Sequence, residues 1–560
     1  MEEQSRHDKQ AINQLLKLAK RGIKPNHSNV ELAFDALAHL GALSDDLDDG
    51  CSLLLTSSLP PSSSFLRALL DLLIWSINGA FATKDGAPID PPAEHNHQHP
   101  LPKRRARAQN KEGLSNKFYT DRITTVLLRL LFNLITFHLD TKIKHSGAMG
   151  VKRIALATEH DVDHTIVDLS SFLMLQLRHT FCPGEKKPNF DLTLLILSRT
   201  VELEAVRLVW MQDDEQKEHD DAQAAAHFNP DLDVHPVVDG MHVLIGILES
   251  SDTLTLTNYS CTYRILNLLI KWHHDDKSGK EKAMPCIAAS VEILEMVQER
   301  VQDMKDEQHN PDKDSNDAAT HIEHLMVQCF GFLASLTYNC VAVQEEVLSS
   351  GIATPCIQTF QTYHHKNPAI VIQCLGFLSS FMSRGGPKAA LSMIDGMLTS
   401  TFISSLLETC QLYPRREQIQ RLATNTLAFV VAIVVCNIKE NDVDSELSDE
   451  EANSDLDNED DEDDEDDEDS EGEKKGKKGK KVVPPTKIER LFDLYTELNV
   501  IQILVGVATR LKLLEESYLR RNDMSKDLYF QKTKQSIGLI NTFHSRQLWK
   551  REHPDESDED

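Results

Sequence analysis

The sequence has few aromatic residues, few turn-forming residues and no closely spaced cysteine pair. Aromatic residues make up 6% of the 560 residues, and there are only 23 glycines and 21 prolines. An all-β fold or a TIM barrel needs many turns and stiff side chains, so this composition argues against both. The ten cysteines form no CxxC pair, and most lie in apolar helical stretches, as Cys329 does. We expect them to be buried free thiols in a reducing compartment.

The chain also lacks a long apolar run and an N-terminal signal peptide. Its longest apolar run covers residues 427–435, far fewer than the roughly 20 residues that a membrane-spanning helix needs. We therefore expect no membrane span and a soluble intracellular protein, nuclear or cytoplasmic and not secreted.

Basic residues are scarce relative to acidic ones. The formal charge of −29 disfavours direct sequence-specific nucleic-acid binding, because phosphate contacts need a basic surface. Residues 444–473 hold 20 acidic residues and no basic one. Six lysines follow directly, so this block carries a net charge of −14 and the rest of the chain −15. The folded part is therefore acidic as well.

Apolar residues recur at helical spacing over most of the chain, as in residues 122–138, whereas strict alternation is almost absent. This pattern predicts an all-α protein. Polar stretches between the helices cannot bury enough apolar surface to offset their ordering entropy. The predicted segments are an N-terminal helical cap (1–83), a disordered Pro-, His- and basic-rich loop (84–116), helical repeats (117–438), a disordered linker that is acidic and then Lys-rich (439–487), a C-terminal helical cap (488–550) and an acidic tail (551–560).

Internal repetition is the most informative signal. Residues 327–335 read VQCFGFLAS and recur 45 residues later, at 372–380, as IQCLGFLSS. A weaker third copy begins at Ile419. A glycine or alanine also precedes an apolar helix repeatedly, at Gly240, Ala283, Gly351 and Gly396. Units of this length have an apolar face that only a stacked neighbour can bury.

These repeats resemble the armadillo/HEAT superfamily. Residues 344–348, followed by Gly351 and Pro355, resemble the second helix, glycine break and third helix of an armadillo repeat, and residues 146–151 resemble another break. The resemblance implies a right-handed α-solenoid of about six to nine units with polar inserts. Glycine would let two helices meet at a sharp angle. The alternative is an irregular all-α domain whose sequence echo is fortuitous.

The ladder residues of the nuclear-import type of armadillo protein are missing. Those proteins hold basic peptides with Trp and Asn side chains, but the corresponding positions here are Gly331 and Ser335, then Gly376 and Ser380. Only Asn133 matches an Asn position. We therefore do not expect that mode of peptide binding, although the acidic surface still suits a basic partner.

The resemblance nevertheless implies a non-catalytic scaffold or adaptor that binds a protein partner along its concave surface. Repeat position places the groove near residues 357–365 and 402–409. The candidate partner-binding residues in this groove are Tyr363, His364 and His365, and Asn133 is the fourth candidate.

No enzyme motif is present: the sequence has no Walker loop, no GxSxG and no kinase motif set. We expect no catalysis, no cofactor and no metal. One competing hypothesis is a metal-dependent helical hydrolase, because His160, His164 and Asp168 follow helical spacing. We favour a solvated helix start as the explanation of these residues. The other histidine clusters are His95, His97 and His99 in the Pro-rich loop, and His273 and His274 at a helix end.

The charge runs support a further hypothesis, a nuclear chromatin- or ribosome-biogenesis-associated factor whose acidic tract binds basic proteins. A solvated linker is the alternative interpretation of the tract. Four serines are followed by acidic residues as in casein-kinase-2-type sites: Ser448, Ser454, Ser470 and Ser557. Basic runs that fit nuclear localisation signals contain Lys103, Arg104, Arg105 and Arg107, and Lys474, Lys475, Lys477 and Lys478.

Overall fold

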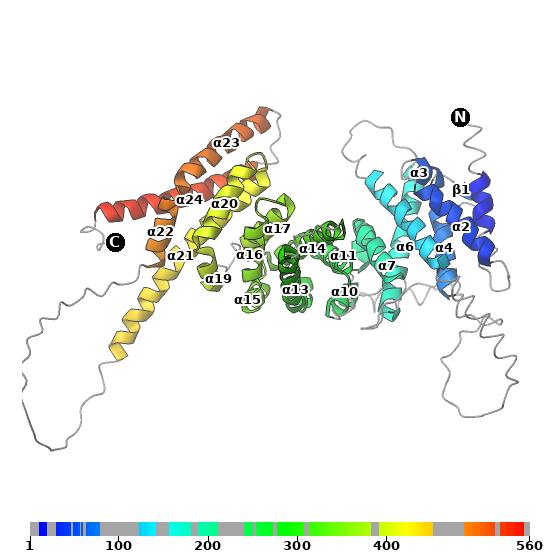
Figure 1. The fold of residues 1–560 in the computed structure, drawn as a ribbon, viewed down its shortest axis with the longest axis horizontal. Helices are drawn as coiled ribbons and strands as arrows, with labels where there is room; N and C mark the ends of the chain where they lie inside the picture. The colour runs from blue at the N-terminus through cyan, green and yellow to red at the C-terminus, as the bar shows by residue number, and fades with distance from the viewer. Residues whose placement is uncertain are drawn as a thin grey trace, which may run out of the picture. The chain divides into compact units, whose positions relative to one another are not determined.

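The computed structural model describes most of the chain in helical stretches that form two compact units (Figure 1). Unit 1 comprises Met1–Ala289 and Asp312–Phe332, and unit 2 comprises Ser290–Pro311 and Leu333–Asp560. The described residues are 10–18, 30–45, 49–55, 58–59, 63–78, 122–141, 156–180, 189–210, 240–249, 254–272, 277–306, 313–381, 391–451, 486–520 and 527–553.

Unit 1 is helical, which confirms the all-α prediction for its described part. The one strand pairing there joins β1 (Ser58–Leu59) and β2 (Ser63–Ser64) as a two-residue antiparallel ladder. The helices are 10–18, α2 (Val30–Ser44), α3 (Asp49–Leu55), α4 (Phe65–Asn78), Arg122–Thr141, α6 (Leu156–Thr180), α7 (Phe190–Thr200), α8 (Glu204–Trp210), α10 (Gly240–Glu249), α11 (Leu256–Trp272), α12 (Lys277–Lys282), the first part of α13 (Cys286–Asp306) and α14 (Lys313–Thr337) as far as Phe332.

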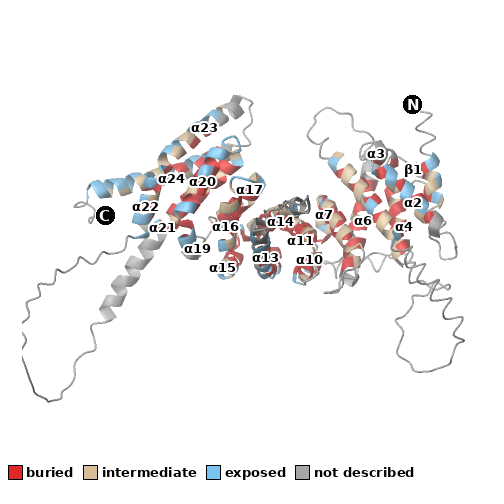
Figure 2. Ribbon diagram, viewed as in Figure 1, coloured by how far each residue is buried: buried red, intermediate tan, exposed pale blue. Residues whose placement is uncertain are grey.

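Leucine-rich helix faces build the core of unit 1. Leu69 and Leu73 of α4 are fully buried, as are Leu127 and Leu131 of the helix Arg122–Thr141. Their spacing of four residues places each pair on one side of its helix. The predicted helix at 122–138 is therefore present, with its apolar stripe inside the unit, where Figure 2 shows buried residues along the packed sides of the helices.

Unit 2 is also helical throughout its described residues. It takes the last part of α14 (Lys313–Thr337), most of α13, and the helices that follow them in the chain. These are α15 (Val341–Ser349), α16 (Ala353–Tyr363), α17 (Pro368–Ser380), α19 (Leu391–Met397), α20 (Ser400–Leu412), α21 (Glu417–Glu451), α22 (Lys487–Glu497), α23 (Val500–Arg520) and α24 (Asp527–Glu552).

The repeated segments occupy equivalent helices. Residues 327–335 lie in α14, and residues 372–380 lie in α17. Among the residues that the structure describes, a short helix and then a longer one follow each copy: α15 and α16 after the first, α19 and α20 after the second. The local order of helices therefore repeats together with the sequence.

The two glycine markers in unit 2 work differently. Gly351, between α15 and α16, has φ +77°, a left-handed conformation that disfavours any residue with a Cβ. Gly396 lies inside α19, where an added Cβ would be 3.3 Å from Ile357 Cδ1. Gly351 thus supplies a backbone conformation that glycine favours between two helices, whereas Gly396 lets α19 pack closely on α16.

Helix α21 is longer than the sequence predicted. The linker was expected to begin at residue 439, but α21 continues to Glu451. Its first half is held in the core, where Leu427 and Val430 are fully buried. Once such a helix is nucleated, each further residue adds a hydrogen bond at low cost, so the helix extends into the acidic sequence. Helices α13 and α14 likewise extend into the polar sequence at residues 303–318.

The C-terminal helices pack on α21. The buried hydroxyl of Tyr495 in α22 donates to the Leu427 carbonyl at 2.8 Å. Ser536 Oγ of α24 donates to Asn425 Oδ1 at 2.9 Å. Helix α22 begins with a capping box, in which Thr486 and Glu489 bind each other's backbone N–H.

Two described helices are long and apolar enough to cross a membrane by length and composition alone. They are Arg122–Thr141 and Glu417–Val435, each with a mean hydropathy of 1.4. A third candidate is the bent pair Lys487–Glu497 and Val500–Leu513. In Glu417–Val435, 72% of the apolar window is buried inside the protein. The expected absence of a membrane span stays a prediction.

Candidate protein-binding face

Helices α16 and α20 lie side by side in unit 2, and aromatic packing fixes their spacing. Phe360 and Phe402 are both fully buried, and their rings meet edge to face with centroids 5.7 Å apart. Such aromatic pairs contribute beyond the area that they bury. The two helices therefore hold a defined register.

A row of polar contacts runs along the surface of this helix pair. Gln361 Nε2 donates to Thr401 Oγ1 at 3.3 Å. His364 Nε2 lies 3.0 Å from Glu408 Oε2, and His364 Nδ1 lies 2.8 Å from the Gln361 carbonyl oxygen. Both ring nitrogens of His364 therefore face oxygen atoms, which fixes the orientation of the ring between the two helices.

The Glu408 carboxylate is hydrogen-bonded to side chains from both sides of the helix pair. In addition to His364, it accepts a hydrogen bond from Ser404 Oγ at 3.1 Å. The hydrogen bond from His364 lowers the pKa of the Glu408 carboxyl, and the bond from Ser404 acts in the same direction. The carboxylate is thus held ionised at a surface that is otherwise lined by neutral polar groups.

The three predicted groove residues have different environments. Tyr363 is buried, with the Lys366 ammonium 6.0 Å from its ring centroid. His365 is exposed, and its ring packs edge-on against His364 at 5.0 Å. His364 and His365 are thus at the surface, whereas the Tyr363 side chain is buried beneath them. We name the surface formed by Gln361, His364, His365, Thr401, Ser404 and Glu408 the α16–α20 face.

Asn133, the fourth predicted residue, binds within unit 1. Its Nδ2 donates to Ser44 Oγ and to Asp45 Oδ1, both at 3.1 Å. The amide therefore joins the helix Arg122–Thr141 to the end of α2, and its donors are engaged inside the protein.

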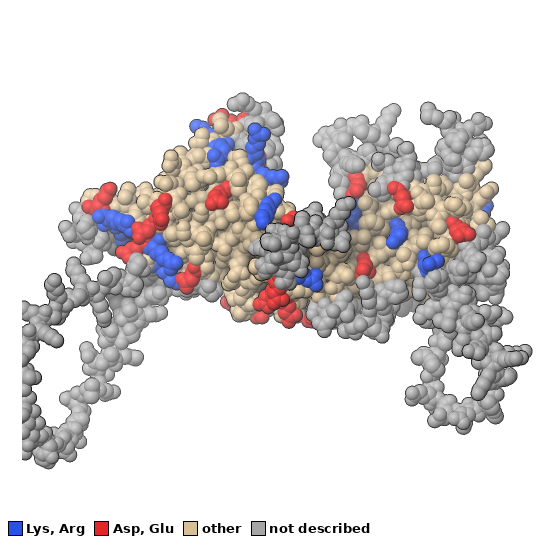
Figure 3. Space-filling model, viewed as in Figure 1, with Lys and Arg blue, Asp and Glu red and all other residues tan. Residues whose placement is uncertain are grey.

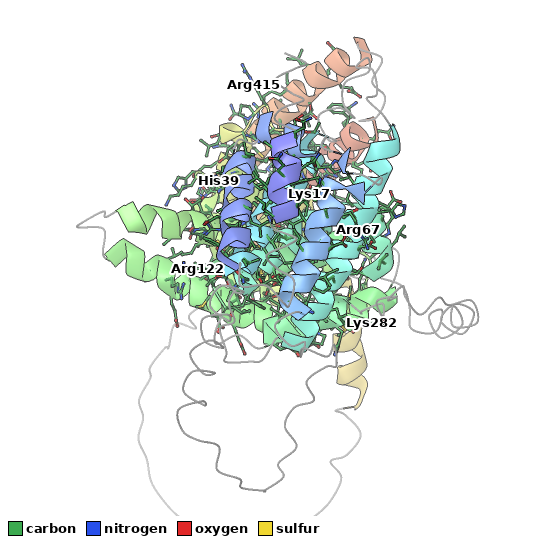
Figure 4. All side chains as sticks on the ribbon, turned by 90° about the vertical axis from the view of Figure 1, so that its right-hand side faces the viewer. Lys17, His39, Arg67, Arg122, Lys282 and Arg415 are labelled. Carbon is green, nitrogen blue, oxygen red and sulfur yellow. The ribbon has the colours of Figure 1, made fainter. Side chains whose placement is uncertain are left out.

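The candidate metal ligands His164 and Asp168 on α6 do not form a metal site with other described side chains. His164 is exposed, and Asp168 forms an ion pair with Arg67 of α4. Figure 4 labels Arg67 where α4 and α6 run side by side. The side chain of His160 lies outside the described residues. Among the side chains that are described, no three His, Cys, Asp or Glu residues are grouped as a metal site would require.

Sequence reasoning missed a charged network in unit 1. Arg199 of α7 binds Asp140 at 2.5 Å and Glu202 at 2.8 Å, and Arg264 of α11 also pairs with Glu202. Glu202 and Arg199 are mostly buried. Because Asp140 and Arg264 lie about 60 residues from their partners in the sequence, no local motif could have indicated the network.

Arg207 extends this region toward the end of α11. Its guanidinium donates to the carbonyls of Val201 and Glu202, both at 2.9 Å, and lies 4.6 Å from the centroid of the Trp272 ring. Burial lowers the pKa of Arg207, whereas Glu204 and Glu202 act against that shift. These contacts bind helices together, which is a structural role.

Several predicted features lie outside the described residues. They are the two basic runs, three of the four phosphorylation sites, the histidine clusters at 95–99 and 273–274, and the repeat break at 146–151. Ser448 lies on α21, but its side chain is outside the described set. These assignments stay predictions.

Comparison with known proteins does not identify a family for this chain. No protein-family profile matches the sequence. No curated protein matches it either. An engineered protein with a solved crystal structure aligns over 95% of this chain and 99% of its own, with 10% identity and a TM-score of 0.40. A circular tandem repeat protein aligns over 98% and 99%, with 11% identity and a TM-score of 0.25. Likenesses this low do not identify the type of repeat.

Proposed function

We propose that this protein is a non-catalytic helical-repeat scaffold that binds a protein partner along the α16–α20 face. The observation that carries the proposal is the row of side-chain contacts between α16 and α20. Gln361 contacts Thr401, which follows it by 40 residues in the sequence, and His364 contacts Glu408, which follows it by 44 residues. Two consecutive repeats thereby present one continuous polar surface.

An armadillo/HEAT-like arrangement is part of this proposal. It is supported by the repeated segments in α14 and α17 and by the left-handed Gly351 between α15 and α16. The hydroxyls of Thr337 and Ser380, 43 residues apart, are also hydrogen-bonded to each other inside unit 2. Stacked helical repeats characteristically place their long helices in one extended binding surface.

The chemistry of the face suits the backbone of a peptide or helix. Gln361, Thr401 and Ser404 carry groups that donate and accept hydrogen bonds, and Glu408 adds one negative charge. A surface of this kind recognises a partner through hydrogen bonds and register more than through net charge.

The test uses the full chain with a double variant, His365→Glu and Ser404→Arg, which changes charge and shape on the face. The control is Glu345→Arg on the exposed side of α15. Quantitative mass spectrometry of affinity-purified material should show at least one partner depleted about tenfold by the face variant and retained by the control. Equal recovery of every partner with both proteins would contradict the proposal.

A second candidate function is supported by charge alone: the 20 acidic residues of 444–473 could bind basic proteins in the nucleus. Replacing residues 452–473 by a neutral segment of equal length leaves α21 intact. Binding of purified histones should then weaken and lose most of its salt dependence. Unchanged histone binding would remove this candidate and leave the tract as a solvated linker. Nuclear access and phosphorylation of the four serines remain proposals.

A further inference from the structure

Helix α24 carries a regular row of exposed residues from Gln535 to its C-terminal end. Gln535, Leu539, Thr542, Arg546, Trp549 and His553 follow one another at intervals of four, three, four, three and four residues. This alternation places them on one side of the helix. We name this row, together with the adjacent Lys550, the α24 stripe.

The opposite side of α24 is committed to the core. Phe530, Thr533, Ile537, Ile540 and Phe543 are buried where α24 packs on the rest of unit 2. The α24 stripe therefore faces away from that packing. An exposed row at intervals of three and four is the geometry that receives a second helix, because it matches the spacing of a coiled-coil seam.

Two large apolar side chains are exposed within the stripe. Leu539 is 46% exposed and Trp549 is 44% exposed. The Trp549 ring stacks on His553, with centroids 5.0 Å apart and an interplanar angle of 16°. Scattered exposed hydrophobics are ordinary. Two that share one stripe, one of them a stacked tryptophan, are typical of interface anchors.

The charged members of the stripe are basic. Arg546 and Lys550 lie next to Trp549, and neither has a carboxylate partner among the described residues. Other basic groups of this helix are paired: Lys534 binds Glu515 at 2.7 Å, and Arg551 binds Asp493 at 2.5 Å. Figure 3 accordingly shows acidic and basic side chains next to each other at this end of unit 2.

We propose that the α24 stripe docks an acidic amphipathic helix of a partner protein, whose apolar residues cover Leu539 and Trp549 and whose carboxylates pair with Arg546 and Lys550. Two copies of α24 facing each other would oppose like charges, which disfavours self-association through this surface. The overall charge of −29 disfavours nucleic acid as the occupant.

The experiment measures fluorescence anisotropy of a labelled synthetic helix of about three heptads, with leucines along one side and glutamates flanking them. The full chain is titrated as wild type, as Arg546→Glu with Lys550→Glu, and as Trp549→Ala. The control Lys512→Glu removes an exposed cation of α23. A second probe replaces every glutamate of the peptide by lysine.

We expect the double charge variant to bind about tenfold more weakly and Trp549→Ala about three- to tenfold more weakly, with Lys512→Glu unchanged. Raising salt from about 50 to about 300 mM should weaken only proteins that keep both cations. The proposal would be overturned if the double variant and Lys512→Glu bound the peptide equally well, or if the lysine probe bound as tightly as the glutamate probe. Tighter binding of a DNA duplex of about 20 base pairs would also overturn it. So would a dimer of this protein that the double variant abolishes. Because no variant alters the α16–α20 face, these results are independent of the proposed function.

Discussion

Gln344 ties two helices of unit 2 together from inside its core by binding the backbone of Ser380. Its Nε2 donates to the Ser380 carbonyl at 3.2 Å and to the Thr337 carbonyl at 2.9 Å. Both carbonyls belong to the last turns of their helices, where intrahelical partners are missing. One buried amide thus satisfies the ends of both α14 and α17.

Replacing Gln344 with alanine should therefore destabilise the protein by about 1–3 kcal/mol, because two buried carbonyls lose their donor. Gln358→Ala on the exposed side of α16 is the control and should change stability by less than about 0.5 kcal/mol. Urea unfolding followed by circular dichroism measures both. A cost for Gln344→Ala no greater than that of the control would show that the amide does not stabilise these helix ends.

Gly351, between α15 and α16, and Gly376, within α17, predict opposite effects of substitution by alanine. Gly351→Ala should cost about 1–2 kcal/mol, because alanine is strained at φ +77°. Gly376→Ala, within α17, should stabilise by about 0.5–1 kcal/mol, since an added Cβ meets nothing within 4 Å. Thermal unfolding of the two variants should therefore shift in opposite directions. Two shifts of the same sign would contradict the structural distinction between these positions.

Helical periodicity and the glycine markers were readable from the sequence because both are local. Residues 372–380 form a helix for the same reason as 327–335, and Gly351 breaks the chain as its position in the repeat implied. The contact between His364 and Glu408 could not be predicted, since the two residues are 44 positions apart in the sequence and their contact depends on how α16 and α20 pack. The end of α21 was also missed, because propagation from a buried segment overrides the preference of an acidic sequence for solvent.

The contact between His364 and Glu408 predicts a pH-dependent contribution to stability. Because the hydrogen bond from His364 lowers the pKa of folded Glu408, its contribution is present above the unfolded carboxyl pKa of about 4.3 and is lost as pH falls through the lower folded value. Glu408→Gln should cost less than about 1 kcal/mol at pH 7, since the carboxylate is largely exposed.

The measurement is urea unfolding of wild type and Glu408→Gln at neutral pH and at a pH below about 4. The difference between the two proteins should shrink toward zero in acid. A difference that stays constant, or grows as the carboxyl is protonated, would mean that the ion pair does not contribute in this way.

The charged network in unit 1 predicts a larger effect. Glu202→Gln would leave Arg199 and Arg264 close together without their shared, mostly buried carboxylate. We expect a loss of about 2–3 kcal/mol, somewhat below the range for a fully buried pair. The exposed neighbour Glu204→Gln is the matched control, with an expected change below about 0.5 kcal/mol. Differential scanning calorimetry separates the two outcomes, and equal melting temperatures would show that solvent screens the network.

The packing of α22–α24 on α21, through Tyr495 and Leu427 among others, has a consequence for the acidic tract. Helices α21 and α22, on either side of residues 452–485, belong to one packed unit, and the acidic tract joins them in the sequence. A protease that cuts anywhere within it would leave the C-terminal piece held by non-covalent contacts, and the nicked protein would migrate as one species until it is denatured.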